Sequence, residues 1–289
     1  MNRIIIKDKK SNYFFKDIYK EYNVYEMYGL RTDKKLHKIL ARKGIFIFGK
    51  WKKVVKQCDE IIIFESLYNL RVAKHIKKYN PNCRVILFFW NTIVDKTRKK
   101  YLEDDNIDEF WTFDPKDAVK YNLNLNTQFY TKKIKLKEDI RPEIDVLFLG
   151  RDKGRKDKLL ELERNLQHNN INTRINIIEK SKDHVSYQKY LKDVEKSKVI
   201  LEYVIEGQTG LTLRCMESLF FKKKLITNNR EIEKYEFYNP NNIFVLGKDN
   251  LDDIKQFIDS EYIEIDPKII EYYDIEKWLN RFNKKEGKI

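Results

Sequence analysis

The stretch EGQTGLTLRCMESLFFKKKLITNN, residues 206–229, decides how the rest of the chain is interpreted. It follows a β-branched run at 199–205 that is short enough for a buried strand. Glycines then favour a turn, and apolar side chains that recur every three or four residues predict a helix. Thr209 or Thr212 is placed to cap the first amides of that helix. The segment LITNN predicts a second strand, so the stretch is a loop, a helix and a strand.

The predicted loop connects the carboxyl end of a strand to a helix N-terminus, where unpaired backbone N–H groups can bind an anion. In open α/β sheets, ligands bind at that edge. Arg214 is placed to pair with a phosphate, and Glu217 is placed to accept hydrogen bonds from ribose hydroxyls. The alternative is an ordinary surface loop and helix in which both side chains are only solvated. The spacing alone leaves both interpretations open.

The order of strand, EG-x-x-GL loop, helix with an inner glutamate, and strand resembles the donor-binding segment of GT-B glycosyltransferases. Among these enzymes, the segment resembles in particular the group 1 glycosyltransferases found in bacterial polysaccharide gene clusters. The resemblance implies that Glu217 holds the ribose of a nucleotide-sugar and that backbone amides at 210–212 hold its diphosphate. The commoner family pattern has a second glutamate at the place that Thr209 occupies here, and Glu206 lies three residues before it. Inversion or retention of the sugar configuration is therefore left open.

Elsewhere, apolar runs alternate with helical patterns, which predicts parallel sheets. In the first half we predict strands at 3–6, 23–28, 59–65, 84–90, 109–113 and 127–130, and helices at 11–21, 34–40, 70–78, 96–102 and 115–121. In the second half we add strands at 145–150, 173–178 and 242–246, helices at 157–167, 187–197 and 252–258, and a helical tail at 267–282. The run IFIF at 45–48 fits a strand or a helix. Asp114 is a plausible cap, with Pro115 at the first helical position.

These elements predict an α/β protein with two Rossmann-like domains. We expect domains at 1–135 and 136–266, separated by the polar, charged stretch 131–144. The resemblance implies that the two parallel sheets face a cleft, with the acceptor bound by the first domain and the nucleotide-sugar by the second. It also implies that a C-terminal helix, 267–289, crosses back to the first domain.

The net charge of +14 over 289 residues is unevenly distributed. Residues 1–139 contain 31 Lys and Arg against 18 Asp and Glu, a net charge of +13. Such asymmetry indicates a polyanionic partner: an anionic membrane surface, a lipid-linked acceptor or a nucleic acid. The alternative is that lysine is simply the default surface residue of this protein. Nucleic acid is the less favoured partner because no RNP-like or zinc motif accompanies the charge.

Three unpaired cysteines and the absence of a signal peptide or a long apolar run predict a cytoplasmic protein, with any membrane role peripheral at the inner face. The four histidines lack metal-ligand spacing, and no DxD follows a strand, so we expect no metal and no cofactor beyond the donor. The chain has no GxGxxG, P-loop or GxSxG motif, which disfavours dehydrogenases, kinases and esterases.

Two further places offer candidates. The loop after the 145–150 strand carries Gly150, Arg151 and Lys156, which can approach and neutralise a diphosphate, or form a basic turn. In the first half, Glu65 ends a strand and is the candidate general base of an inverting transferase, or else a solvated carboxylate. Asn91 ends the next strand and is placed to orient an acceptor, while His75 is a less favoured base.

We therefore expect a metal-independent glycosyltransferase of bacterial surface polysaccharide biosynthesis, such as that of lipopolysaccharide or capsule. Its acceptor would be a glycan, a lipid-linked molecule or a protein-linked molecule. The alternatives are a non-catalytic nucleotide-sugar-binding subunit and a polyanion-binding or nucleic-acid-binding α/β protein. The candidate donor-binding residues are Gly150, Arg151, Lys156, Glu206, Thr209, Gly210, Leu211, Thr212, Arg214 and Glu217.

Overall fold

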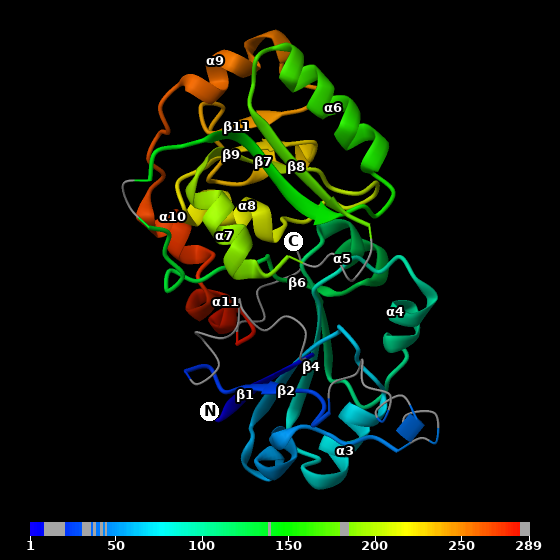
Figure 1. The fold of residues 1–289 in the computed structure, drawn as a ribbon. Helices are drawn as coiled ribbons and strands as arrows, with labels where there is room; N and C mark the ends of the chain where they lie inside the picture. The colour runs from blue at the N-terminus through cyan, green and yellow to red at the C-terminus, as the bar shows by residue number, and fades with distance from the viewer. Residues whose placement is uncertain are drawn as a thin grey trace. The chain divides into compact units, whose positions relative to one another are not determined.

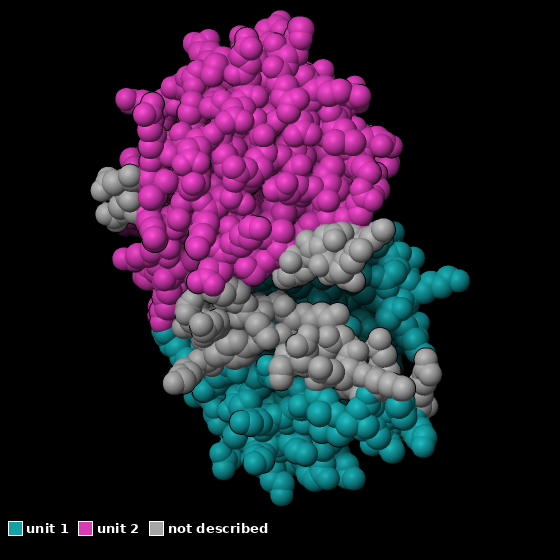
Figure 2. Space-filling view, in the orientation of Figure 1, with its two compact units in different colours: residues 1–126 teal, residues 127–289 magenta. Residues whose placement is uncertain are grey.

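The structure is a computed structural model that describes residues 1–8, 21–30, 36, 39–40, 43, 45–137, 140–179 and 185–283. The chain divides into two compact units, Met1–Asn126 and Thr127–Ile289, which Figure 2 colours separately. Each unit contains one sheet, and both sheets are described below by themselves. Among the described residues, no helix combines the length and the apolar character needed to span a bilayer.

Unit 1 is built on a six-stranded sheet in the order β2-β1-β3-β4-β5-β6. Its strands are β1 (Arg3–Lys7), β2 (Val24–Glu26), β3 (Glu60–Phe64), β4 (Arg84–Phe89), β5 (Glu109–Thr112) and β6 (Asn124–Leu125). All pairings are parallel. The chain leaves β1 in one direction to form β2 and then returns to the other side of β1 for β3. The strand order therefore reverses between β1 and β3.

The described helices of unit 1 follow the predicted alternation. They are the short 3-10 turns η1 (Lys50–Lys53) and η2 (Val55–Gln57) and the helices α3 (Arg71–Tyr79), α4 (Lys96–Tyr101) and α5 (Pro115–Tyr121). Asp114 caps α5 as predicted, since its side chain accepts from the backbone N–H groups of Lys116 and Asp117 at 3.0 and 3.2 Å.

Unit 2 contains a five-stranded parallel sheet in the order β11-β10-β9-β7-β8. The strands are β7 (Ile144–Arg151), β8 (Thr173–Ile178), β9 (Ser197–Glu202), β10 (Lys224–Thr227) and β11 (Ile243–Val245). The helices are α6 (Lys156–His168), α7 (Tyr187–Glu195), α8 (Leu213–Phe220), α9 (Ile254–Asp259), α10 (Pro267–Tyr272) and α11 (Ile275–Arg281), with the 3-10 turns η4 (Arg230–Lys234) and η5 (Leu251–Asp253). Figure 1 shows helices covering both faces of this sheet. The strand order reverses between β7 and β9.

Burial on both faces of the sheets explains why these runs of apolar, β-branched residues form strands. Ile61, Ile62 and Ile63 are fully buried in β3, as expected for a strand that is covered on both faces. In unit 2, Val146 and Phe148 of β7 pack with the leucines of α6, while α9 contributes Ile254 and Phe257 to the same cluster. The predicted fold class, α/β with two Rossmann-like units, is confirmed.

Some predicted elements differ. The strand expected at 127–130 is wrong: β6 ends the sheet at Leu125, and Tyr130 makes only an isolated bridge to Asp274. Its backbone N–H donates to Tyr273 and its carbonyl accepts from Ile275, both at 2.9 Å. These contacts group the connecting residues with the C-terminal tail, so the division lies before 127 rather than at the expected 135.

Other predictions have mixed outcomes. Residues 45–48 form neither a strand nor a helix, apart from a bridge between Phe48 and Tyr28. The helix expected at 11–21 and most of the one expected at 34–40 lie outside the described residues. The cleft between the two sheets and the crossing of the tail to the first domain stay predictions.

Candidate functional site

Two arginines converge on the carboxyl edge of the unit 2 sheet, where the strand order reverses. Arg214, near the start of α8, donates through Nη2 to the carbonyl of Leu149 in β7. Arg155 donates through Nη1 to the carbonyl of Tyr203, just after β9, and through Nη2 to that of Arg151 at 3.1 Å. Both guanidinium groups lie against the ring of Phe148, 4.9 and 5.2 Å from its centroid. The pair therefore bridges the ends of β7 and β9.

The two arginines retain unused donors. Among the described residues, the buried side-chain polar atoms that find no hydrogen-bond partner are Nε of Arg155 and Nε of Arg214. Burial, followed by the neighbouring charge of Arg214, lowers the pKa of Arg155 to about 10. A buried and a half-buried cation, each with an unpaired Nε–H, form a site that an anion would stabilise.

Gly150 is required by this arrangement. A Cβ atom added there would lie 2.5 Å from Nη2 of Arg214 and 3.1 Å from Nη2 of Arg155. A larger residue would force at least one of the two guanidinium groups to move. The predicted Gly150 and Arg214 are thus brought together, as expected of residues that serve one site.

Arg155 was missed by the sequence analysis, which chose Arg151 and Lys156. Lys153 and Gly154 both have positive φ angles, 49° and 78°, and turn the loop back on itself. The Asp152 carboxylate accepts from the backbone N–H of Arg155 at 3.0 Å, which starts α6 and directs Arg155 inward. The Arg151 side chain is exposed, and the ammonium of Lys156 pairs with Glu179 at 2.5 Å.

A buried carboxylate occupies the N-terminus of α8. Glu202, the last residue of β9, is 1 % exposed and accepts from the hydroxyl of Thr212 and, at 2.6 Å, from that of Thr227. The backbone N–H of Thr212 also donates to it. Burial raises the pKa of Glu202, although these bonds and the Arg214 charge act in the opposite direction. Sequence analysis gave no sign of Glu202, because a strand of apolar residues ends on it.

The loop before α8 carries the other predicted ligands. Thr212 caps the helix, accepting from the backbone N–H of Arg214 at 3.1 Å, so its amide and its hydroxyl are both engaged within the protein. Gly210 and Leu211 are buried beside it, whereas the Glu206 side chain is exposed. The carbonyl of Thr209 accepts from the side chain of Asn229 at 3.1 Å. Direct contact of these residues with a diphosphate stays a prediction.

Glu217 lies one turn further along α8, inside a tyrosine cluster. Its two carboxylate oxygens accept from the hydroxyls of Tyr187, at 2.6 Å, and Tyr190, at 2.7 Å, and Tyr187 in turn contacts the hydroxyl of Tyr130 at 2.6 Å. The side chain is 1 % exposed, and burial raises the pKa of Glu217 to about 7. A ribose could reach this carboxylate only by replacing tyrosine hydroxyls. Its role as the ribose ligand stays a prediction.

The raised pKa of Glu217 gives a stability prediction with a definite sign. The folded carboxylate holds its proton up to about pH 7, whereas the unfolded one releases it near 4.5. Stability from this group is therefore full below about pH 4.5 and is lost as the pH rises to about 7. Relative to Glu217→Gln, the wild type should lose about 3 kcal/mol of unfolding free energy across this window. Urea denaturation at several pH values measures the difference. Glu206→Gln, at an exposed carboxylate, is the control, and parallel curves for wild type and Glu217→Gln would contradict the assignment.

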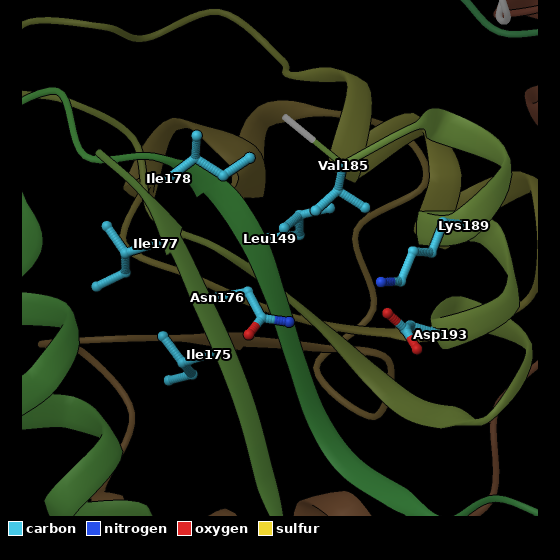
Figure 3. A pocket seen from close by; sticks show the side chains of 8 residues that line it. All are labelled: Leu149, Ile175, Asn176, Ile177, Ile178, Val185, Lys189 and Asp193. Atoms are coloured by element: carbon cyan, nitrogen blue, oxygen red, sulfur yellow. The ribbon is translucent and has the colours of Figure 1, made fainter. Parts of the chain in front are cut away.

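A pocket of about 330 Å³ lies between α7 and the part of the sheet formed by β7 and β8, and neither Arg155 nor Arg214 lines it. Figure 3 shows Lys189 and Asp193 projecting from α7 towards Leu149 and Asn176 on the sheet. Ile175, Ile177, Ile178 and Val185 contribute the rest of the apolar lining. Leu149 connects the two features, because its side chain lines the pocket while its carbonyl accepts from Arg214. The volume is within the range of small-molecule sites.

The carboxyl edge of unit 1 brings Glu65 and Asn91 together. Glu65 is 1 % exposed and accepts from the Asn91 side chain at 2.6 Å, the backbone N–H of Trp90 at 2.8 Å and Nε of Arg98 at 3.2 Å. Burial raises the pKa of Glu65, and these three partners oppose that effect. The carboxylate lies beside the reversal in strand order between β1 and β3. Its action as a general base stays a prediction, and it would require a partner to move.

Comparison with known proteins supports the fold. No protein-family model matches the chain. No curated protein sequence matches it either. Among solved structures, the lipopolysaccharide outer core galactosyltransferase WaaB in its apo form aligns over 98 % of both chains, at 12 % identity and a TM-score of 0.49. An alpha-glucosyltransferase, solved with UDP and a 13-mer DNA containing an A:G mismatch, aligns over 97 % of this chain and 92 % of its own, at 11 % identity and a TM-score of 0.52.

The second match shows that this chain shares the fold of a glycosyltransferase along almost its full length. At that identity the likeness shows the fold alone. Together with the two parallel sheets, it confirms the GT-B fold class expected from the sequence.

Proposed function

We propose that the protein is a glycosyltransferase that moves a sugar from a nucleoside diphosphate sugar to a glycan, lipid-linked or protein-linked acceptor. The observation that carries the proposal is the pair Arg155 and Arg214. Their guanidinium groups converge where the strand order reverses, and each has a buried Nε–H without a hydrogen-bond partner. In open α/β sheets this is the place where nucleotides bind.

The proposed role in catalysis follows from the positive charges of Arg155 and Arg214. Transfer of the sugar leaves a nucleoside diphosphate, on which negative charge grows as the glycosidic bond breaks. Arg155 and Arg214 would stabilise that charge electrostatically, as a metal ion does in other transferases. The pocket lined by Leu149, Asn176 and Val185 would hold the nucleoside. On the acceptor side, Glu65 and Asn91 lie together at the equivalent edge of unit 1.

A thermal-shift screen with UDP, GDP, TDP, ADP and CMP tests the donor site. The similar glucosyltransferase was solved with UDP, so UDP is the first to be tried. A nucleotide present at 100 times its Kd adds about 2.7 kcal/mol, which corresponds to a rise in Tm of roughly 5–10 °C. We expect such a shift with at least one diphosphate, and a loss of it in Glu217→Ala if that residue holds the ribose. No shift with any nucleotide would contradict the proposal.

Turnover separates an enzyme from a binding subunit. If the preferred diphosphate binds but its sugar conjugates are neither hydrolysed nor transferred to a broad set of acceptors, the protein is a nucleotide-sugar-binding subunit. Transfer to lipid-linked or glycan acceptors from bacterial surface polysaccharides would support the proposed role in their biosynthesis.

A further inference from the structure

One face of unit 1 combines the exposed side of α3 with the segment 45–57. Ring contacts fix the two side by side: the Arg71 guanidinium lies 5.2 Å from the centroid of Phe46, and the His75 ring lies 4.9 Å from that of Phe48. His75 also contacts Trp51, with 5.5 Å between ring centroids. In Figure 1 this segment lies next to α3. We call this surface the basic face.

The charge of the basic face has one sign. The stretches 45–58 and 66–83 contain eight Lys and Arg residues and no Asp or Glu. Those that are exposed are Lys50, Lys52, Lys53, Lys56, Arg71, Lys74 and Lys78. The pKa of His75 is lowered, first by burial and then by the charges of Lys52 and Lys78, which places both lysines near this ring. Lys77, the eighth, pairs with Asp108 at 2.7 Å, so the basic face carries the charges of seven exposed cations.

Apolar side chains project among these cations. Ile45 is 51 % exposed, and Leu67 and Tyr79 are each 44 % exposed. Leu67 belongs to the same surface, because its carbonyl accepts from the Tyr28 hydroxyl at 3.0 Å and the Tyr28 ring lies 6.2 Å from Phe46. Leu67 also has a φ of 60°, a left-handed conformation that disfavours leucine. Leu67 is therefore exposed at a strained position and is not part of the buried core of the unit.

We propose that the basic face docks on the surface of an anionic lipid bilayer. The lysines would contact phosphate headgroups, while Ile45, Leu67 and Tyr79 would enter the interface between headgroups and acyl chains. Aliphatic side chains gain little from a nucleic-acid backbone, and of the aromatic rings described on this face only that of Tyr79 is well exposed, since Phe46 and Phe48 pack on each other and on Tyr28. A lipid surface matches both the charge and the apolar residues.

The position of the basic face determines which part of unit 1 docking would bring to the bilayer. Glu65 directly follows β3, and the chain continues through Leu67 into α3. The Leu67 end of the basic face therefore borders the carboxyl edge at which Glu65 and Asn91 meet, whereas its other end, where Asn80 donates to the carbonyls of Val55 and Cys58, lies at the start of β3. Docking would hold that edge at the bilayer surface, where lipid-linked molecules are found.

Co-sedimentation with lipid vesicles tests whether the positive charge of the basic face drives membrane binding. The protein is mixed with vesicles of pure phosphatidylcholine or of equimolar phosphatidylcholine and phosphatidylglycerol, with no nucleotide present. We expect binding to the anionic vesicles only. The Lys52→Gln, Lys78→Gln protein should bind roughly 25-fold more weakly, since each cation near an anionic surface contributes about a factor of five. The matched control, Lys158→Gln, Lys192→Gln, removes two exposed lysines of unit 2 and should bind like the wild type.

The Leu67→Asn variant tests whether the apolar side chains of the basic face contribute to membrane binding. Asparagine tolerates the left-handed conformation, so the variant should fold with an unchanged or higher Tm, yet bind anionic vesicles about five-fold more weakly. Equal losses in the two lysine variants, an unaffected Leu67→Asn or no vesicle binding would each overturn the proposal. So would tighter binding to RNA than to vesicles, which would identify a nucleic-acid surface.

Discussion

Replacing Arg214 by alanine is expected to weaken nucleoside diphosphate binding by about 100- to 1000-fold. The guanidinium is partly buried, carries an open Nε–H and shares the Phe148 ring with Arg155. Hydrogen bonds to charged groups contribute about 1.5–3 kcal/mol each, and a diphosphate would accept at least one from this side chain in addition to its charge. Isothermal titration of wild type and variant with the diphosphate found by thermal shift measures the loss.

Two further variants make the test specific. Arg151→Ala removes an exposed arginine from the same loop, and we expect binding to change by no more than about two-fold. Arg214→Lys keeps the charge but not the planar fork, so it should recover only part of the affinity. A diphosphate that binds Arg214→Ala as tightly as the wild type would show that the arginine pair is not the donor site.

The fold was largely predictable because its signals are local. β3, β4 and β7 are apolar runs flanked by polar residues, and the pairs Asp114 and Pro115 or Thr212 and Arg214 show where helices begin. The predictions that failed concern residues whose conformation depends on tertiary contacts. Residues 127–130 look like a strand in isolation, but Tyr130 pairs with the tail more than a hundred residues later in sequence.

The site was only partly predictable, because it depends on side-chain direction. Four basic residues follow Gly150 within six positions, and composition does not tell which one folds back. The left-handed turn at Lys153 and Gly154 turns Arg155 inward and leaves Arg151 exposed. Glu217 illustrates the same limit: its place in α8 was predicted, but the tyrosines that surround it come from α7, whose register against α8 is set by packing.

Glu202 yields the largest expected change in stability. Glu202→Ala would leave the hydroxyls of Thr212 and Thr227 and the backbone N–H of Thr212, the N-cap of α8, without their buried acceptor. Buried groups that lose a partner cost about 1–3 kcal/mol each, so we expect unfolding free energy to fall by about 3–5 kcal/mol. Urea denaturation measures this, and Glu206→Ala, at an exposed carboxylate nearby, should change it by less than about 0.5 kcal/mol.

Glu202→Gln separates the charge of this side chain from its hydrogen bonds. The amide still accepts from one threonine hydroxyl and can donate to the other, so most of the stability should be retained. The carboxylate, however, interacts with both Arg155 and Arg214 and would repel a diphosphate bound to them. Neutralising it should tighten diphosphate binding by about five-fold, since charges near a protein surface interact by roughly 1 kcal/mol or more. Weaker binding in Glu202→Gln would instead mean that the carboxylate positions the arginines, and that their geometry, more than their charge, determines the affinity.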